Sequence, residues 1–299
     1  MIPSVRHPLI TIGVPVYNGE RYLPATLDSL LNQTIEDFVI LVADNASTDG
    51  TADIVRDYAA RDSRVHHIRH PRNLGAAVNY NRVFELANTK FFRWSSCDDV
   101  SEPRFLEACL PVLERDADAV LVYPRVRLID GDGHQLRDYD EGLHLPHERA
   151  SDRFFALLDR IRLCNAVYGL LRRDVVCRTR LMGSFRGSDI VFQAELSLYG
   201  KFIEIPEVLF LRRMHEQAYA SSPDEQQHQF YRPGRRQGIE LRGWRHLGEH
   251  LRSVVRAPVS LEERLRLLAG LARRATWGRE GLLDEIYVAA RALFTSERA

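Results

Sequence analysis

The chain is poor in lysine and cysteine, has no long apolar run and carries no excess charge of either sign. Its 299 residues contain 41 basic and 41 acidic side chains, so no global field attracts a polyanion and we expect no nucleic-acid partner. Lysine occurs only at Lys90 and Lys201. No apolar run approaches the roughly 20 residues that span a bilayer, and residues 1–8 contain no apolar signal core.

The few cysteines lack the spacing of a zinc site or a redox motif. Cys97, Cys109, Cys164 and Cys177 include no C-x-x-C pair, which argues for free thiols in a reducing compartment. We therefore expect a soluble, cytoplasmic protein. The length suits one large domain, or one domain with an appended subdomain.

Buried strands alternate with amphipathic helices in the first half of the chain. Nearly continuous apolar runs at residues 9–15, 38–43 and 91–94 predict strands buried on both faces, and leucines at helical spacing in residues 20–33 predict a helix. This alternation predicts an α/β fold with a Rossmann-like, mostly parallel sheet flanked by helices. The other expected elements of this half are helices at 51–60, 76–87 and 104–113 and strands at 65–68 and 119–123.

Beyond Pro124 the alternation weakens. We expect a hairpin over residues 126–136, and Ser188 or Asp189 as the cap of a following helix. A polar stretch begins at Gln217 and leads into a helical tail. We expect a main domain over 1–216, in halves 1–124 and 125–216, and a helical C-terminal region over 217–299. The other elements expected here are helices at 151–163 and 190–199 and strands at 166–171, 202–205 and 208–213.

The C-terminal region is rich in arginine. Twelve arginines stand against four acids between Arg232 and Arg279, and Ser260 with Glu263 has the spacing of a capping box. A basic amphipathic tail either lies on an anionic lipid surface or packs on its own domain. Both alternatives stay open, so we retain peripheral contact with the inner membrane face as an expectation.

Polar residues follow three of the predicted parallel strands. They are Tyr17 and Asn18 after the first strand, Asp44 after the second, and Asp98 with Asp99 after the fourth. Ligands of open parallel sheets lie outside the carboxyl ends of the strands, so we expect these side chains to meet at one crevice. Adjacent carboxylates suit Mg²⁺ or Mn²⁺, which bind one or two carboxylates and the oxygens of a substrate diphosphate. A solvated turn is the alternative for the two adjacent acids.

Four stretches of the chain, taken in order, resemble glycosyltransferase family 2, an inverting group with the GT-A fold. They are residues 14–23, 43–51, 72–75 with Asn81, and 96–99. The resemblance implies a donor that is a UDP or dTDP sugar, a divalent metal (Mn²⁺ or Mg²⁺), and an acceptor hydroxyl on a glycan, a glycolipid or a small molecule. It implies a role in cell-surface glycan or glycoconjugate biosynthesis. The Q-x-x-R-W signature of processive synthases is absent, which indicates a non-processive enzyme.

The resemblance assigns nucleotide-side roles to several positions. Pro15 and Tyr17 match positions that line the base and diphosphate pocket, and Asp44 matches the carboxylate that hydrogen-bonds the nucleobase or ribose. The loop and helix start that shape the nucleotide side match Asn73, Gly75 and Asn81.

Further positions resemble the metal site and the catalytic base of the family. Asp98 matches the last acid of the D-x-D motif, and His215 resembles the histidine of an R-x-H element that completes the metal or diphosphate site. Asp189 resembles the catalytic base. Two positions depart from the pattern: Ser96 occupies the first D-x-D position, and Ser188 stands where an acid often precedes the base.

Two other functions compete with this interpretation. A sugar nucleotidyltransferase would need a glycine-rich loop with a basic residue after the first strand, and residues 16–19 do not form one. A nucleotide-sugar-binding protein without catalytic activity stays open, because Ser96 and Ser188 replace expected acids.

Overall fold

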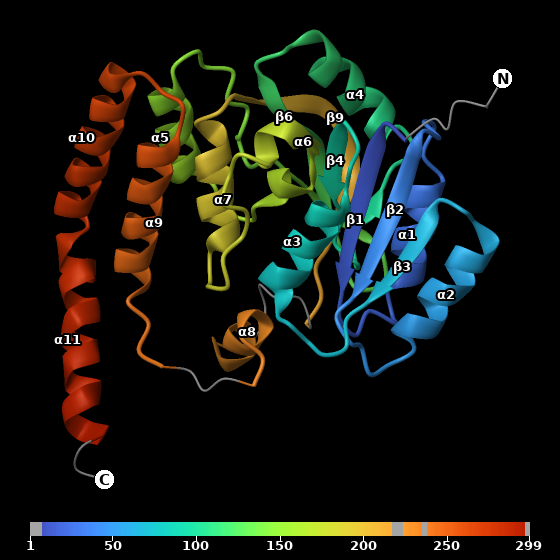
Figure 1. The fold of residues 1–299 in the computed structure, drawn as a ribbon, viewed down its shortest axis with the longest axis horizontal. Helices are drawn as coiled ribbons and strands as arrows, with labels where there is room; N and C mark the ends of the chain where they lie inside the picture. The colour runs from blue at the N-terminus through green and yellow to red at the C-terminus, as the bar shows by residue number, and fades with distance from the viewer. Residues whose placement is uncertain (1–7, 217–223, 235–237, 297–299) are drawn as a thin grey trace.

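A nine-stranded mixed sheet forms the centre of the structure, a computed structural model that describes residues 8–216, 224–234 and 238–296 (Figure 1). The strands are β1 (Ile10–Val16), β2 (Phe38–Asp44), β3 (Val65–Arg69), β4 (Phe91–Trp94), β5 (Val100–Ser101), β6 (Ala119–Ile129), β7 (Gln135–Tyr139), β8 (Leu170–Arg172) and β9 (Lys201–Arg213). Their order across the sheet is β3-β2-β1-β4-β8-β6-β9-β5, and β7 pairs with β6.

Helices cover both faces of this sheet. They are α1 (Leu23–Leu31), α2 (Thr51–Arg61), α3 (Ala76–Leu86), α4 (Phe105–Arg115), α5 (Ala150–Arg160), a 3₁₀ turn (Asn165–Tyr168), α6 (Arg173–Val176), α7 (Ser188–Ser197), α8 (Asp224–Tyr231), α9 (Arg242–Arg256), α10 (Leu261–Trp277) and α11 (Arg279–Ser296). Buried side chains of α1, α2 and α4 form a core on one face, and those of α3, α5, α7, α9 and α10 form a second core.

The parallel half of the sheet follows the prediction. Strand β1 pairs in parallel with β2 and with β4, and β2 pairs in parallel with β3. All seven residues of β1 are buried, as its apolar run predicted. Because these four strands run in one direction, their carboxyl ends lie at the same edge of the sheet.

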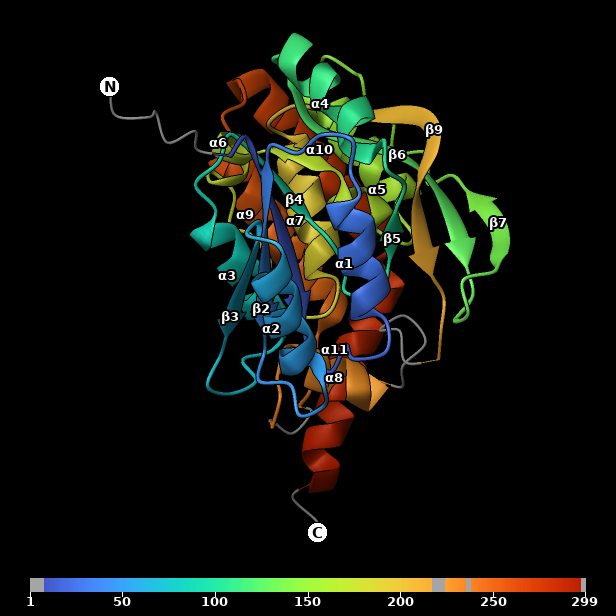
Figure 2. The same cartoon turned by 90° about the vertical axis from the view of Figure 1, so that its right-hand side faces the viewer.

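The second half is mixed, and it differs from the prediction in two places. The expected strand at 166–171 is a 3₁₀ turn followed by the short β8, which pairs antiparallel to β4 and β6. The two strands expected at 202–205 and 208–213 are one strand, β9, whose pairing with β6 is irregular between Ile205 and Val208. The predicted hairpin is confirmed as β6–β7, which lies at one side of the molecule in Figure 2.

One predicted helix cap is confirmed and one is wrong. Ser260 Oγ accepts the backbone N–H of Glu263 at 3.2 Å, while the Glu263 carboxylate reaches α5 and accepts the N–H of Ser151 at 2.9 Å. Neither Ser188 nor Asp189 caps α7, because Gly187 occupies the N-cap with a left-handed φ of 80°. A glycine adopts that conformation at little cost.

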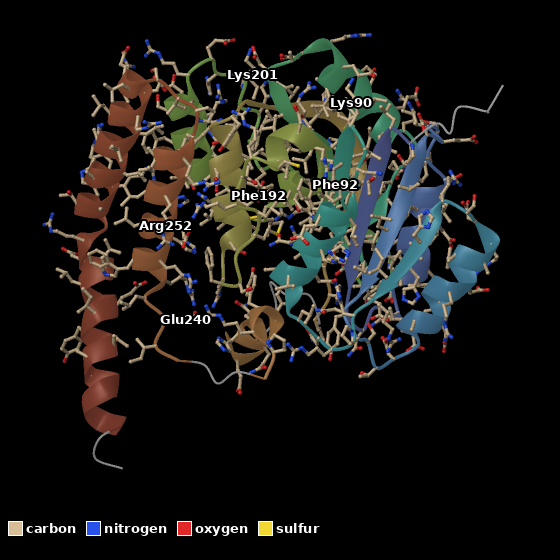
Figure 3. All side chains as sticks on the ribbon, viewed as in Figure 1. Lys90, Phe92, Phe192, Lys201, Glu240 and Arg252 are labelled. Carbon is tan, nitrogen blue, oxygen red and sulfur yellow. The ribbon has the colours of Figure 1, made fainter. Side chains whose placement is uncertain are left out.

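The C-terminal helices complete the second core. Four side chains of this region are buried in the same cluster as Phe192: Val254 of α9, Ala257 at the C-cap of α9, and Leu267 and Leu271 of α10. Figure 3 shows Phe192 of α7 and Phe92 of β4 in the layer between the helices and the sheet. Helices α9 and α10 thus pack on the domain expected over 1–216, and the boundary at residue 217 stays a prediction. Helix α11 extends past the carboxyl edge of the sheet in Figures 1 and 2.

The two labelled lysines identify the amino-terminal ends of β4 and β9 in Figure 3. Lys90 precedes β4 and Lys201 begins β9, and Figure 3 places both at the upper end of the molecule. The carboxyl ends of the parallel strands therefore lie at the lower end, together with α8 and the beginning of α3 (Figure 1).

Candidate active site

The carboxyl ends of β1 and β4 open into a cavity of about 740 Å³. Helix α8 closes one side of it with Gln229 and Phe230. The expected convergence on one crevice is confirmed for these two strand ends. The predicted residues that line the cavity are Pro15, Tyr17, Asn18, Asn73, Asp98, Asp99 and His215.

Asp98 and His215 form a pair in the wall of this cavity. The distance between Asp98 Oδ2 and His215 Nε2 is 3.0 Å, although 117 residues separate them in the sequence. The Ser96 hydroxyl donates a hydrogen bond to Asp98 Oδ1, so the serine in the first D-x-D position orients the remaining carboxylate. The His215 ring packs on Tyr22 with ring centroids 4.8 Å apart.

The Asp98–His215 pair fits a divalent cation. Burial would raise the pKa of Asp98, but hydrogen bonds from His215 and Ser96 outweigh burial and hold that pKa below its usual value. Asp98 is thus an ionised carboxylate beside an imidazole, on a cavity with room for further oxygen ligands. Mg²⁺ and Mn²⁺ bind such sets of one or two protein ligands together with substrate phosphates.

Asp99 lines the same cavity, but its carboxylate is committed to the protein. Its Oδ1 accepts the backbone N–H of Arg213 at 2.8 Å, and its carbonyl accepts the Thr26 hydroxyl at 2.8 Å. Burial and the nearby Asp98 charge raise the pKa of Asp99. The two adjacent acids therefore have different surroundings: Asp98 faces the cavity, and Asp99 ties the end of β9 to β5. The alternative of a solvated turn is excluded, because Asp99 is buried.

Tyr17 and Asn18 form the turn after β1. The Tyr17 side chain is 46% exposed, so it is not a core residue and is free to contact a ligand in the cavity. Asn18 adopts a positive φ of 53°, and its Oδ1 accepts the N–H of Thr48 at 2.9 Å. Asn18 thereby fixes the turn after β1 against the loop that follows β2.

Asp44 lies beneath the cavity wall and does not line it. Its carboxylate is fully buried, its Oδ1 accepts the N–H of Ser47 at 2.7 Å, and its Oδ2 lies 3.2 Å from Arg69. The carboxylate thus organises the loop after β2. Contact between Asp44 and a nucleotide stays a prediction.

The loop before α3 is built around Asn73 and Gly75. Asn73 Oδ1 accepts hydrogen bonds from Asn45 Nδ2 at 2.8 Å and from the Gly75 N–H at 2.9 Å. Gly75 has a φ of 86°, and a Cβ there would lie 2.5 Å from the Tyr231 carbonyl of α8. Gly75 itself is absent from the cavity lining. Its role in this structure is to let α8 approach α3.

Asn81 does not reach the cavity. Its side chain makes two hydrogen bonds with the backbone of Met182, of 2.8 and 3.1 Å. Asn79 lines the cavity instead, and its Nδ2 donates to the Ala43 carbonyl at 2.9 Å. The structure thus gives Asn81 a structural contact, and the nucleotide role that the resemblance assigned to it is not supported by its position.

Asp189 lies at the first turn of α7, beside Cys164. Burial raises the pKa of the Cys164 thiol, and the charge and hydrogen bonding of Asp189 raise it further. Asp189 is absent from the cavity lining, which extends as far as Tyr168 and Arg212 on that side. Glu195, the other acid of α7, is fully buried, and its carboxylate pairs with Arg180 at 3.1 Å. Its position excludes contact with a substrate.

Sequence reasoning missed several cavity residues. Tyr80 and Tyr168 approach each other through their hydroxyls at 3.3 Å, and Arg212 and Phe230 complete the wall. The available signal for Arg212 was its place next to the R-x-H element. The tyrosines come from α3 and from the 3₁₀ turn, and only tertiary packing brings them together.

Two other polar clusters contain potential metal ligands. Asp130, Asp132 and His134 are the one group of three such ligands found among the described residues, but the Asp130 carboxylate is occupied with the N–H groups of its own turn. His67 and His70 turn to different partners, Asp44 and Asn79. Neither cluster opens into the cavity.

Comparison with known proteins agrees with this fold. The model of the family described as Glycosyl transferase family 2 matches residues 11–178. An uncharacterized glycosyltransferase of Methanocaldococcus jannaschii is 30% identical over 141 residues, which are 46% of this chain and 49% of that protein. The putative teichuronic acid biosynthesis glycosyltransferase TuaG of Bacillus subtilis is 31% identical over 146 residues, or 48% and 56% of the two chains. This chain spans less than two thirds of either relative.

Solved structures show the same fold. The crystal structure of S. aureus TarS residues 1–349, also solved with UDP, superposes with a TM-score of 0.63 at 15% identity, over 89% of this chain and 71% of that one. The mannosyltransferase PcManGT of Pyrobaculum calidifontis, in complex with GDP-Man and Mn²⁺, superposes with a TM-score of 0.54 at 17% identity, over 98% and 80% of the chains. The fold and the cavity at the carboxyl ends of the strands are those of the GT-A class of glycosyltransferases. The chain belongs to glycosyl transferase family 2.

Among the residues that the structure describes, none of the helices has the length and apolar character needed to cross a bilayer.

Proposed function

We propose that this protein transfers a sugar from a nucleotide diphosphate to an acceptor hydroxyl, with inversion at the anomeric carbon. The observation that carries the proposal is the Asp98–His215 pair, which folding brings to 3.0 Å in the wall of the strand-end cavity. The family supports the reaction class. The UDP and GDP-Man complexes of structurally similar proteins support a nucleotide-sugar donor.

Asp98 and His215 would hold the divalent cation, Mn²⁺ or Mg²⁺. When bound, the cation would neutralise negative charge on the leaving diphosphate. Ser96 keeps the Asp98 carboxylate turned toward the cavity, and Tyr22 fixes the plane of the His215 ring. The protein thus presents two ligands in a fixed orientation before substrate arrives, and such preorganisation favours charge development in the transition state.

The turn after β1 and the loop before α3 would hold the nucleoside. Pro15, Tyr17 and Asn73 line the cavity on this side, and the exposed Tyr17 ring offers a face for stacking. We propose UDP or dTDP as the nucleotide. The UDP complex of TarS supports the first of these.

Asp189 is our proposed base for the acceptor hydroxyl. It lies beside Cys164, whose neighbours Leu163 and Asn165 accept the hydrogen bonds of Arg212 in the cavity wall. Asp189→Asn should lower transfer about 10²- to 10⁴-fold, the usual contribution of a general base. It should leave the dissociation constant of UDP unchanged, because Asp189 is outside the donor motifs.

UDP release from a panel of UDP sugars, with Mn²⁺ and mixed acceptors, measures this effect. Asp174→Asn on α6, an exposed acid, is the matched control and should keep wild-type activity. Wild-type transfer by Asp189→Asn would show that the base lies elsewhere.

The product is proposed to be a cell-surface glycan or glycoconjugate, made by one transfer per encounter. The name of the TuaG relative supports a role in polysaccharide biosynthesis. The competing function is binding of nucleotide sugars without turnover, which the serines at positions 96 and 188 favour. Turnover of bound donor in the presence of Mn²⁺ separates the two functions, since a binding protein releases no UDP.

We also propose contact with the inner membrane face through the C-terminal helices. Leu261 and Leu265 of α10 and Trp277 at its end are 58–75% exposed, and arginines flank them in the sequence. Apolar side chains with flanking arginines suit an anionic lipid surface. Co-sedimentation with vesicles of anionic and of neutral lipid tests this proposal, and equal recovery in the two would contradict it.

A further inference from the structure

Arg212, on β9, is a cavity residue with no role so far. Its Nη1 donates to the Leu163 carbonyl and to Asn165 Oδ1, both at 2.5 Å. These two bonds hold one edge of the guanidinium, while the side chain remains part of the cavity wall. Arg212 lies three residues before His215 and outside the R-x-H element, so the family motif does not explain it.

The loop that holds Arg212 is itself fixed by a buried carboxylate. Glu141 accepts the backbone N–H groups of Arg162 at 2.9 Å, Cys164 at 2.6 Å and Asn165 at 2.9 Å. Cys164 has a φ of 59°, a left-handed conformation that is strained for a residue with a side chain. Glu141 thus stabilises an unfavourable loop shape whose carbonyl and amide oxygens face the guanidinium.

The charge of Arg212 lowers the pKa of Asp98 and opposes the rise in the pKa of Asp99, but the guanidinium forms no hydrogen bond with either carboxylate. Both acceptors of Arg212 are neutral oxygens, and within the described part of the chain the guanidinium makes no ion pair. The nearby carboxylates have other partners: Asp98 binds Ser96 and His215, and Asp99 binds the Arg213 N–H. A partly buried cation with neutral partners is a ready site for an anion.

We propose that Arg212 binds an oxyanion of the nucleotide-sugar donor, a proposal that rests on the donor site described above. A guanidinium held at one edge presents its remaining N–H groups as a planar fork, which matches the two oxygens of a phosphate or a carboxylate. The oxyanion is either the diphosphate or a carboxylate on the transferred sugar. Both lie within reach of a residue that shares the cavity wall with Asp98 and Tyr168.

Three probes distinguish these sources: UDP, UDP-glucose and UDP-glucuronic acid. UDP-glucose and UDP-glucuronic acid differ only in one group of the sugar, which is CH₂OH in the first and a carboxylate in the second. Their dissociation constants are measured by calorimetry in Mn²⁺ for the wild type, Arg212→Gln and Arg212→Lys. Arg104→Gln is the matched control, because Arg104 pairs with Glu207 outside the cavity. Thermal unfolding verifies that each variant is folded.

The expected loss on Arg212→Gln is about 10- to 100-fold in affinity, the usual effect of removing a charged hydrogen-bond partner. An equal loss for all three probes identifies the diphosphate, and a loss confined to UDP-glucuronic acid identifies the sugar carboxylate. Arg212→Lys should retain only part of the affinity, since an ammonium lacks the fork.

Wild-type affinity of both folded Arg212 variants for every probe would overturn this inference and leave the donor site intact. If Arg212→Gln does not fold, wild-type affinity of Arg212→Lys for all three probes is sufficient to overturn the inference. Absence of Mn²⁺-dependent binding of UDP and of dTDP by the wild type would overturn the proposed function, and this inference with it.

Discussion

Replacement of Asp98 by asparagine removes one negative charge and keeps the shape of the side chain. The cavity wall offers two metal ligands, Asp98 and His215, so the cation should bind weakly alone and tightly with a diphosphate. Loss of a residue that only orients a ligand typically weakens metal binding 10- to 100-fold. Loss of one of two direct ligands should therefore weaken it by at least about 100-fold, or about 2.7 kcal/mol.

The assay is the dissociation constant of UDP, measured by calorimetric titration of the protein once in Mn²⁺ and once in EDTA. In the wild type, Mn²⁺ should tighten UDP binding, and in Asp98→Asn the two affinities should become equal. Asp138→Asn serves as control, because Asp138 is an exposed acid of β7 that pairs with Arg127. Retention of the full Mn²⁺ effect in Asp98→Asn would refute the assignment of Asp98 as a metal ligand.

Two further predictions concern stability. Burial, with the charges of His246, Arg180 and Arg274, lowers the pKa of His250 to about 3. The unfolded chain binds a proton near pH 6.5 and the folded chain does not, so this residue makes stability fall by about 1.4 kcal/mol per pH unit as pH drops from 6.5 toward 3. Between pH 6.5 and pH 5, the free energy of unfolding measured in urea should fall by about 1.6 kcal/mol less in His250→Gln than in the wild type. Equal losses in the two proteins would contradict the burial argument. Asn81→Ala should lower the free energy of unfolding by about 1–3 kcal/mol, because two backbone groups of Met182 lose their partners. Its affinity for UDP should not change, and a weakened affinity in calorimetry would return Asn81 to the nucleotide site.

The strand ends could be predicted from the sequence because their signals are local. A run such as residues 9–15 is apolar enough to be buried on both faces, and parallel strands carry their polar tips to one edge. Those two rules placed Tyr17 and Asp98 in one cavity. The contact between Asp98 and His215 depended on the family resemblance, since 117 residues lie between them.

Other features depend on tertiary contacts that periodicity does not reveal. Asn79 and Asn81 are two residues apart on α3, about 200° around the helix, so only one of them faces the cavity. The arginine-rich composition of the tail left open whether it packs on its own domain, as α9 and α10 do. The hydrogen bonds from the backbone of Cys164 and Asn165 to Glu141 join segments more than twenty residues apart. No sequence pattern marks that loop.

Pulsed electron paramagnetic resonance of Mn²⁺ bound to the protein with UDP tests the central claim most directly. The metal should couple both to the nitrogen of an imidazole, His215, and to the phosphorus of the diphosphate. The nitrogen signal should disappear in His215→Ala while the phosphorus signal persists. Phosphorus coupling without any nitrogen coupling in the wild type, or a spectrum of fully hydrated Mn²⁺, would contradict a metal site made by Asp98 and His215 at the strand ends.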